Sequence, residues 1–457
     1  MGQYVEADAW MVTARGYGPR TYRAFVPHPL SGWDPVLSVE DLDAASAGDR
    51  ALGAIASLPR TGLGGAIADW MAARDESIRS SIIEGVASTE PGLAWARYMD
   101  AAGRPVSDHN DALTLGAVRQ LTFAVALGSK MRGGDACRIG DILEMHETLF
   151  SGTRDRGMGG VLRDEPIWVG PPGCLVDDAT FVAPPPDRVP ELVADLVDYL
   201  NASTHHPVLK AAVAHAQFES IHPFEDGNGR TGRAIIHTVL NAAGAARGAV
   251  PISTTLSHDR HRYYDALDAM HVECAREDTL ARTAAVRPWL TVLSGACQDA
   301  ARHAAASSRR VEGIAAGWHA AGRFRSGSAA SRLLAELPSM PVLDTEMAAR
   351  RLGITPKSAR RAVAALESAG VVSGIGGRRN RRYWVPDLVG LMQQVDPDGG
   401  PPIHGWTPQR QHPRAEPATP DQAQQPTQQC PHYGARSGRR CRLPVGHAGQ
   451  HRYPPDP

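Results

Sequence analysis

Hydrophobic and polar residues recur with helical spacing over most of the N-terminal two thirds of the chain. Between residues 42 and 95 this period dominates, with Ile78, Ile82 and Ile83 at the spacing of one buried face. Two long helical patterns, over 207–220 and 231–245, flank a short glycine-rich segment. The pattern predicts a mainly α-helical protein. Further helices are predicted at 112–127, at 139–149, from the proline-rich stretch 184–190 to Asn201, and onward to about Trp318.

Before the last third of the chain, extended structure is predicted at two places. Residues 22–27 have an extended pattern and lead into a loop that reaches Asp34. Residues 165–173 are β-prone and are bounded by Gly and Pro. We therefore expect a small amount of strand beside the helices.

The last third of the chain changes character twice. Residues 328–390 predict a helix, a short helix, a turn, a third helix and a basic hairpin. Residues 396–429 are rich in Pro and Gln and cannot bury enough apolar surface to fold, so we expect a disordered linker there. The predicted units are 1–110, 111–318, 328–395, the linker 396–429 and a Cys- and His-containing tail at 430–457.

Composition narrows the setting in which the protein works. A chain of 457 residues exceeds what one hydrophobic core normally serves. The net charge of −1 gives no overall attraction to nucleic acid or to an anionic membrane, so such a partner needs a local patch. The first residues lack the pattern of a signal peptide, no uninterrupted apolar span stands out, and six cysteines are sparse. We expect a cytoplasmic protein without a membrane partner.

The segment from His222 to Arg233 combines groups suited to phosphate chemistry. Asp226 opens the turn Asp-Gly-Asn-Gly, whose backbone amides can approach a ligand without side-chain obstruction. A helix is expected to begin near Arg230, so free amides and the positive helix end point to the same place. Arg230 and Arg233 are three residues apart and share a helical face, from which both can donate to phosphate oxygens.

Two further groups complete this set. Asp226 is a hard oxygen ligand suited to a phosphate-bound Mg²⁺, and His222 can accept a proton from a hydroxyl. A base, a metal ligand, an amide cradle and two arginines indicate phosphoryl or nucleotidyl transfer. Taken singly, each feature is more often an ordinary turn, a helix terminator or a solvated face. Because all of them occur together, in this order and between two helices, these ordinary explanations do not account for the segment well.

The whole segment resembles the signature of the Fic family, with no departure. The resemblance covers about residues 22–289 and implies a helical Fic/Fido core with a small β-hairpin flap. It implies transfer of AMP from ATP to a Ser, Thr or Tyr hydroxyl of a target protein, with pyrophosphate leaving. The positions that match the signature are His222, Phe224, Asp226, Gly227, Asn228, Gly229, Arg230 and Arg233.

The same resemblance implies a role for each matching residue. His222 is the base that deprotonates the target hydroxyl, Phe224 is a buried anchor and Asp226 binds Mg²⁺. Asn228 and the amides of Gly227 and Gly229 hold the region of the α-phosphate. The remaining phosphates are clamped by Arg230 and Arg233.

Two other segments resemble parts of Fic proteins. Residues 162–170 are similar to the flap, where a short strand could pair with an extended target segment. Ser80 and Glu84 share a helical face and, with Gly85, resemble the inhibitory motif of the subclass that carries it N-terminally. The resemblance implies that Glu84 pairs with Arg233 and prevents a productive pose of the ATP γ-phosphate. Without it, an edge hairpin and a solvated Glu would be the ordinary explanations.

Residues 328–395 resemble a winged helix-turn-helix domain. Thr355 and Pro356 are a good N-cap and first helical residue, and basic residues follow on the helix and in the hairpin. Such a basic wing suits phosphate backbones, so DNA contact is one hypothesis, and packing or homodimerisation is the other. The basic residues are Lys357, Arg360, Arg361, Arg378, Arg379, Arg381 and Arg382.

The tail contains four ligands that suit tetrahedral zinc. Cys430, Cys441, His447 and His451 lie at compact spacing in a segment too small for a hydrophobic core. A disulfide between the two cysteines would leave both histidines unexplained. We therefore expect a structural Zn²⁺ in a zinc-knuckle-like tail.

The sequence leaves more than one function open. The first hypothesis is an autoinhibited protein adenylyltransferase that uses ATP and Mg²⁺. The second is a DNA-binding regulator in which the Fic core is secondary. A third is a Fic enzyme that transfers phosphate or removes AMP from a modified protein. The target, the modified residue type, the signal that frees Glu84 and the oligomeric state are not specified by the sequence.

Overall fold

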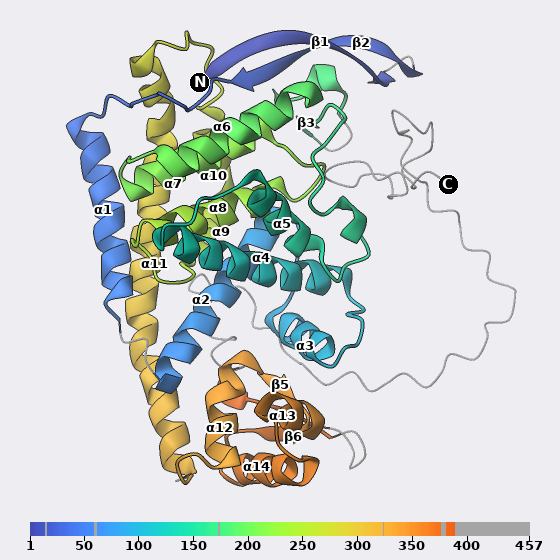
Figure 1. The fold of residues 1–457 in the computed structure, drawn as a ribbon, viewed down its shortest axis with the longest axis vertical. Coiled ribbons are helices and arrows are strands. Elements are labelled where there is room, and N and C mark those ends of the chain that lie inside the picture. The colour runs from blue at the N-terminus through green and yellow to red at the C-terminus, as the bar shows by residue number, and fades with distance from the viewer. Residues whose placement is uncertain (14–15, 59–61, 172–173, 323, 376–380, 389–457) are drawn as a thin grey trace, which may run out of the picture.

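The protein is mainly helical, as the sequence predicts (Figure 1). The computed structural model describes residues 1–13, 16–58, 62–171, 174–322, 324–375 and 381–388. The predicted linker and the predicted zinc ligands Cys430, Cys441, His447 and His451 lie outside these residues, as do Arg378 and Arg379.

An antiparallel hairpin forms the N-terminal part of the fold. Strand β1 (Gly2–Thr13) pairs with β2 (Gly16–Pro27), with Gly2 opposite Pro27. The predicted extended segment at 22–27 is the end of β2. The sequence pattern does not reveal β1, because its small and acidic residues carry little hydrophobic signal.

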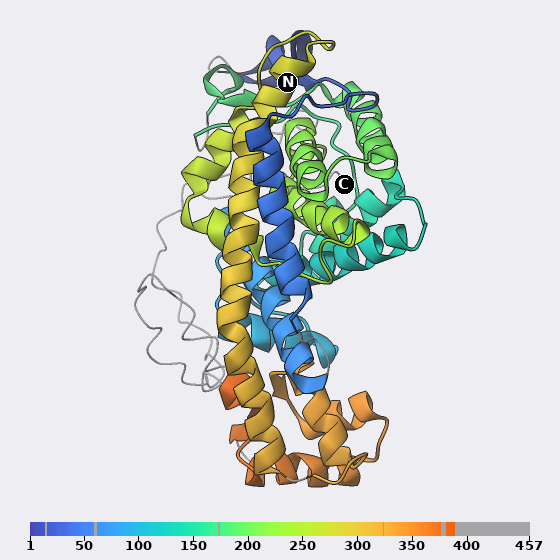
Figure 2. The ribbon, with the colours of Figure 1, turned by 90° about the vertical axis from the view of Figure 1, so that its left-hand side faces the viewer.

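Two helices far apart in sequence lie side by side along the molecule (Figure 2). Helix α1 (Val39–Ala56) begins with a capping box between Ser38 and Asp41. It packs against α11 (Thr279–Ala321), a helix of 43 residues. The two are joined by Asp41, which accepts hydrogen bonds from Arg287 at 2.7 and 2.9 Å.

The main hydrophobic core surrounds α7 (Pro207–Ile221). Nearly every residue of α7 is buried, which is typical of a helix that is apolar all round. It packs on α8 (Asn228–Ala242), and α8 in turn packs on α4 (His109–Arg132). The remaining helices of this region are α5 (Ile139–Phe150), α6 (Val189–Ala202), α9 (Ile252–His258) and α10 (Arg260–Asp268).

A small β-hairpin lies next to the long one. Strand β3 (Trp168–Val169) pairs with β4 (Phe181–Val182), at the position of the expected flap. Its side chains Trp168 and Val182 pack with Met11 and Tyr22 of the long hairpin. Short 3-10 turns at Arg156–Met158, Val176–Asp178 and Pro186–Arg188 complete the connection from α5 to α6.

Helix α2 (Gly62–Ile83) belongs to two cores at once. Its C-terminal part packs against α4, α8 and α9. Its N-terminal part contributes Ile67 and Trp70 to a second hydrophobic cluster, which also contains Trp318 of α11 and Tyr98 of α3 (Glu90–Ala101). One rigid element therefore connects the central helices to the C-terminal region.

The C-terminal region contains the helices and hairpin that the sequence predicts for 328–390. Its sheet is antiparallel in the order β5-β7-β6. Tyr98 donates to Asp344 at 2.8 Å, and Trp318 donates to Asp387 at 2.7 Å, so the region is anchored to α3 and α11. The elements are α12 (Ala329–Glu336), the 3-10 turn Leu337–Ser339, β5 (Val342–Leu343), α13 (Thr345–Leu352), α14 (Pro356–Ser368), β6 (Ser373–Ile375) and β7 (Arg382–Trp384).

This region does not have a core of its own. The residues of α12, α13 and α14 share one hydrophobic cluster with α2, α3 and the end of α11. The unit predicted at 328–395 therefore shares its hydrophobic cluster with the preceding helices, and its bounds stay a prediction.

Helix α4 is long and apolar enough to span a membrane by length and composition alone, with a mean hydropathy of 1.3. In this fold 61% of that helical window is buried against other helices. Burial of this extent is what a central helix of a packed bundle shows.

Candidate active site

His222 ends helix α7 in an unusual backbone conformation. It has φ 50° and ψ 60°, and it is the one non-glycine residue with positive φ among those described. Left-handed geometry is uncommon for a residue with a Cβ and costs roughly 1–3 kcal/mol. The surrounding structure must therefore hold His222 in place.

Arg163 supplies that support from the flap side. Its Nε donates to the His222 carbonyl at 2.7 Å, and its Nη2 donates to the carbonyls of Pro184 at 2.7 Å and Ile221 at 3.3 Å. Nη1 donates to the Glu165 carbonyl at 3.0 Å. Burial lowers the pKa of Arg163 to about 10, so it stays charged at neutral pH. This one side chain joins the end of α7 to both arms of the flap connection.

The His222 imidazole is poised as a neutral acceptor. Its Nδ1 lies 3.3 Å from the Glu219 carbonyl, and a proton on Nδ1 would leave Nε2 free to accept another. Burial, with the Arg163 charge, lowers the pKa of His222 to about 4. The ring is therefore uncharged at neutral pH, which a general base requires.

The loop after His222 is held by Phe224 and Asn228. The Phe224 ring is fully buried and stacks on His146 with 3.6 Å between ring centroids. Asn228 accepts from the Phe224 amide at 2.9 Å and donates to the Phe224 carbonyl at 2.8 Å. The buried anchor expected at Phe224 is present. Asn228 closes the loop here, and its contact with the α-phosphate stays a prediction.

His146 of α5 supports the same loop from the other side. Its Nδ1 accepts from the Gly160 amide at 2.9 Å, which leaves Nε2 to donate to the Asp226 carbonyl at 2.8 Å. Burial lowers the pKa of His146 to about 4 and keeps the ring neutral. Its hydrogen bonds therefore fix the loop that carries Asp226.

The N-terminus of α8 follows directly on this loop. The helix begins at Asn228, slightly earlier than the sequence predicts, and no side chain among the described residues caps it. Gly227 precedes it with φ 82°, where a Cβ would lie 2.8 Å from a Leu149 methyl group. Glycine is therefore required for the turn that aims these amides at one spot.

Arg230 is a buried cation with spare donors. Its side chain is 2% exposed, and its nearest carboxylate is Asp226 at 3.5 Å. Its Nε and Nη1 have no hydrogen-bond partner among the described residues. Unpaired buried donors are costly, so this guanidinium is suited to an anion that enters the site.

Arg233, by contrast, uses four of its five N–H donors within the protein. Its Nε donates to Ser80 Oγ at 2.9 Å, and its Nη2 donates to the Ser80 carbonyl and to Glu84 Oε1, each at 2.8 Å. Its Nη1 donates to Tyr263 Oη at 3.2 Å. The pairing of Glu84 with Arg233 that the sequence resemblance implies is thus present in this structure.

Glu84 also occupies the space in front of α8. A Cβ on Gly229 would collide with Glu84 Oε1 and would lie 2.7 Å from Glu84 Cδ. The carboxylate therefore lies on the first turn of α8, where an anion would otherwise approach the amides. The end of α2 is fixed there by Tyr264, which donates to the Ile83 carbonyl at 3.2 Å.

A buried polar cluster lies behind Arg233. Tyr263 Oη is 3.0 Å from His215 Nε2. Burial and the nearby Glu84 raise the pKa of Glu219 to about 8, so this carboxyl is mostly protonated at neutral pH. Burial also lowers the pKa of His215 to about 3. Sequence reasoning missed these residues, as it missed Arg163 and His146, because single polar residues in helical patterns carry no signal of their contacts.

The basic residues of the C-terminal region divide into two groups. Lys357, Arg360 and Arg361 are exposed on α14. Arg382 instead lies over the Trp95 ring, 4.7 Å from its centroid, and donates to Tyr98 Oη at 3.3 Å. Arg381 pairs with Glu367 at 2.5 Å. These two hairpin arginines therefore contact groups within the protein, and contact of this region with DNA stays a hypothesis.

Four cysteines lie in the described part of the chain. Cys137, Cys174, Cys274 and Cys297 are all free, as predicted from their scatter in the sequence. Within the described residues, no group of three or more His, Cys, Asp or Glu side chains could hold a metal ion.

Part of the chain, including the residues of this site, is similar to known proteins. Residues 137–240 match the model of the Fic/DOC family. The chain is 34% identical over 172 residues to the protein adenylyltransferase Fic of Aedes aegypti, covering 37% of this chain and 31% of that protein. It is 30% identical over 168 residues to the protein adenylyltransferase fic-1 of Caenorhabditis elegans, covering 36% of this chain and 30% of that protein. The chain thus spans about a third of the length of these curated relatives.

Solved structures of Fic proteins are also similar. A Fic family protein from Desulfovibrio desulfuricans G20 has 23% identity and a TM-score of 0.44, covering 77% of this chain and 98% of that chain. Fic-1 of C. elegans has 21% identity and a TM-score of 0.43, covering 59% of this chain and 73% of that chain.

Proposed function

We propose that the Fic/DOC domain of this chain transfers AMP from ATP to a hydroxyl of a target protein and that Glu84 holds this activity off. The observation that carries the proposal is the engagement of Arg233 by Ser80 and Glu84 beside a complete phosphate-binding loop. The names of the relatives support the reaction type. The contact of Glu84 and Ser80 with Arg233, called the brake below, supports the inhibition.

The reaction assigns a distinct task to each polar group. Neutral His222 accepts the proton of a Ser, Thr or Tyr hydroxyl. The hydroxyl oxygen forms a bond to the α-phosphorus as the bond from that phosphorus to the α,β-bridging oxygen breaks, and pyrophosphate leaves. The amides at the start of α8 and the spare donors of Arg230 bind the phosphate oxygens. Positioning and charge stabilisation, rather than covalent catalysis, supply the rate.

The residues present fit a Mg²⁺ ion that is held mainly by phosphates. The Asp226 side chain is 36% exposed, and its Oδ1 accepts from the Gly227 amide at 2.6 Å and lies 3.5 Å from Arg230 Nη2. A carboxylate at this place could give one oxygen ligand to an ion that arrives with the nucleotide. Such an ion would neutralise phosphate charge. In this proposal Asp226 orients the nucleotide and Arg230 holds the same phosphate group from the other side.

The brake acts on both charge and space. Four of the five N–H groups of Arg233 are used by Ser80, Glu84 and Tyr263, so at most one Nη1 hydrogen remains and a γ-phosphate cannot be held by a forked pair of donors. The Glu84 carboxylate also repels phosphate and fills the volume beside Gly229. ATP can therefore reach the productive pose only after Glu84 moves away.

The exposed strand of the flap is an argument for a protein as the substrate that receives AMP. Val169 of β3 is 47% exposed, and the strand is short and lies near the end of α7 through Arg163. An extended target segment that adds to such a strand would be held by main-chain hydrogen bonds. The four free cysteines support a reducing compartment, which we propose is the cytoplasm.

Labelled nucleotide tests the reaction type. Glu84→Gly protein would be incubated with a cell lysate and ATP labelled at the α- or the γ-phosphate, beside Glu84→Gly/His222→Ala protein. The proposal predicts His222-dependent label on protein from α-labelled ATP alone. Label from γ-labelled ATP that appears with Glu84→Gly and not with Glu84→Gly/His222→Ala would show phosphate transfer by this site and would overturn the proposal.

A further inference from the structure

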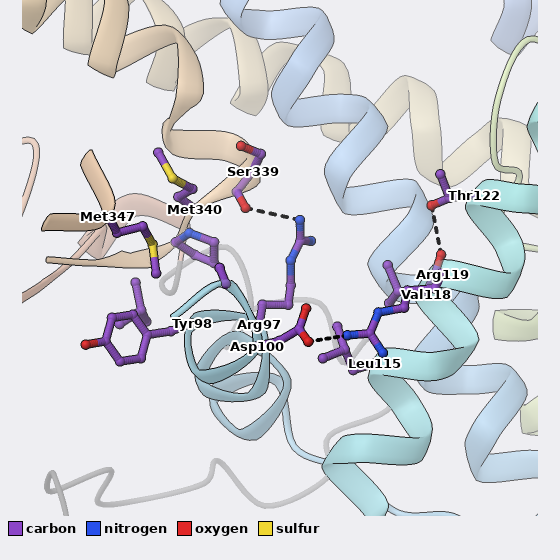
Figure 3. Close-up of a pocket in the computed structure, with 13 residues that line it drawn as sticks. Arg97, Tyr98, Asp100, Leu115, Val118, Arg119, Thr122, Ser339, Met340 and Met347 are labelled. Carbon is purple, nitrogen blue, oxygen red and sulfur yellow. Dashed lines mark hydrogen bonds and ion pairs between the residues drawn. The ribbon is translucent and has the colours of Figure 1, made fainter. Parts of the chain in front are cut away.

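A cavity lies between the central helices and the C-terminal region, away from the His222 motif. Its volume is about 370 Å³, and it is lined by α3, α4 and the segment from Ser339 to Met347 (Figure 3). A volume of this size is in the range of small-molecule sites. None of the residues 222–233 contributes to its lining.

The charges that line this cavity do not balance. Arg119 is neutralised by Asp100, whose carboxylate lies 2.5 Å from its Nη2. Arg97 reaches across the cavity wall and donates to the Ser339 carbonyl at 3.1 Å, as Figure 3 shows. In the part of the chain that the structure describes, no carboxylate forms an ion pair with Arg97. One partly buried positive charge, that of Arg97, is therefore left without an ion-pair partner among the described residues.

An unpaired guanidinium in such a place is unfavourable unless an anion joins it. Burial lowers the pKa of Arg97 below its ordinary value, which reflects the cost of keeping the charge there. A charge of this kind gains most from a partner that offers a planar pair of oxygens. Because the lining carries two arginines and one aspartate, a single negative charge balances it.

The rest of the lining is apolar. Leu115 and Val118 of α4 lie on one side of the cavity, and Met340 and Met347 of the C-terminal region lie on the other (Figure 3). Pro341 also contributes to the lining. Methionine side chains adapt to ligands of irregular shape. We propose that this cavity binds a small organic monocarboxylate, whose carboxylate pairs with Arg97 while its apolar body lies between α4 and the two methionines.

The position of the cavity connects it with the brake, and this step rests on the proposed function. Helix α3 follows Glu84 after a short connection that is fixed to the start of α4. Ser88 donates to Asp111 at 2.6 Å, and Asn110 donates to the Ala87 carbonyl at 3.0 Å. A ligand between α3, α4 and the C-terminal region therefore contacts elements that position Glu84. The cavity is present while Glu84 holds Arg233, so a ligand that binds this arrangement more tightly than the released one stabilises the contact of Glu84 with Arg233.

Calorimetric titration of the full chain tests the site directly. The probe is hexanoate, with hexanamide as a neutral molecule of the same shape and inorganic phosphate as an anion without an apolar body. We expect millimolar or tighter binding of hexanoate, and binding at least about tenfold weaker for hexanamide and phosphate. Equal binding of hexanamide, or no binding of hexanoate at millimolar concentration, would overturn the proposal.

Two variants separate the role of the charge from a general effect on folding. Arg97→Gln should weaken hexanoate binding by about tenfold or more. Arg97→Lys keeps the charge but loses the forked geometry, so its affinity should lie between those of the natural protein and Arg97→Gln. Thermal unfolding of each variant checks that the fold is intact. Unchanged binding to folded Arg97→Gln protein would contradict the assignment. If Arg97→Gln does not fold, the Arg97→Lys protein provides the test. The assignment would be contradicted if this variant bound hexanoate no more tightly than hexanamide.

Activity provides a separate readout for the connection to the brake. Hexanoate should lower the residual rate of AMP transfer by the protein of natural sequence and leave the rate of Glu84→Gly unchanged. An equal effect on both would overturn the connection while leaving the binding site in place. Absence of AMP transfer by Glu84→Gly would count against the proposed function and not against the site.

Discussion

Glu76 of α2 faces His237 of α8 at 3.3 Å, one helical turn away from the contact between Ser80 and Arg233. Glu76, Ser80 and Glu84 are four residues apart and share one face of α2 and its end, and Arg233 and His237 share one face of α8. Glu76 also accepts hydrogen bonds from the Ser253 amide and hydroxyl at 2.8 and 2.6 Å. The brake is therefore one end of a longer helix-to-helix contact.

Weakening the far end of this contact should loosen the brake. Glu76→Gln removes the charge that faces His237 and should lower the free energy of unfolding by about 1–3 kcal/mol. It should raise AMP transfer, but less than Glu84→Gly does, because Glu84 still contacts Arg233. Initial rates of self-modification measure this, with the exposed Asp43→Asn of α1 as a control. A stability loss with no change in rate would show that the pair only supports the fold.

The hydrogen bonds from Arg163 to the end of α7 should matter for catalysis as well as for stability. In Glu84→Gly protein, Arg163→Ala should lower kcat for AMP transfer by about 10- to 100-fold, because His222 would no longer be held in its left-handed conformation. A lysine at this position can reach fewer of the carbonyls. The kcat of the Arg163→Lys variant should therefore lie between the values for Glu84→Gly with Arg163 intact and with Arg163→Ala. Steady-state kinetics beside a thermal unfolding curve check this. A normal kcat in a folded Arg163→Ala protein would contradict the role.

The packing of α4 on α5 gives a prediction about the fold itself. A Cβ on Gly116 would collide with the Leu149 carbonyl oxygen and lie 2.9 Å from its carbon. Gly116→Ala should therefore destabilise the protein by about 1–3 kcal/mol. Gly317→Ala in α11, where nothing lies within 4 Å, should instead be neutral or stabilising by up to about 1 kcal/mol. Chemical denaturation of both variants makes the comparison, and equal midpoints would contradict the packing.

Buried neutral histidines should make the protein sensitive to acid. Burial lowers the pKa of His215 to about 3, so its stabilising contribution is present above pH 6.5 and is lost as the pH falls toward 3. By linkage this contribution is up to about 5 kcal/mol. Urea midpoints between pH 7 and pH 4 should fall more steeply for the natural protein than for His215→Gln. Parallel curves for the two proteins would contradict a buried neutral His215.

The sequence predicts the helices well because their signal is local. The patterns at 207–220 and 231–245 correspond to α7 and α8, and the motif between them lies where the turn chemistry places it. The contact of Glu84 with Arg233 was predictable only through a family resemblance, because 149 residues separate the partners. Hydrophobic periodicity says which face of a helix is buried but not which helix covers it.

The remaining features depend on long-range packing that no local pattern specifies. Arg163 lies in an irregular connection, and its hydrogen bonds to 221 and 222 appear only when the flap folds over α7. The shared core of α2 with the C-terminal region likewise joins segments more than half the chain apart. Strand β1 is fixed by its register with β2 rather than by its own composition.

The central claim is that an intact AMP-transfer site is held off by Glu84. The most direct measurement is the intact mass of three purified proteins after incubation with ATP and Mg²⁺: the natural sequence, Glu84→Gly and Glu84→Gly/His222→Ala. The account predicts that Glu84→Gly alone gains the mass of one or more AMP groups, while the other two stay essentially unmodified. Equal modification of the natural protein and Glu84→Gly, or none of Glu84→Gly, would contradict it.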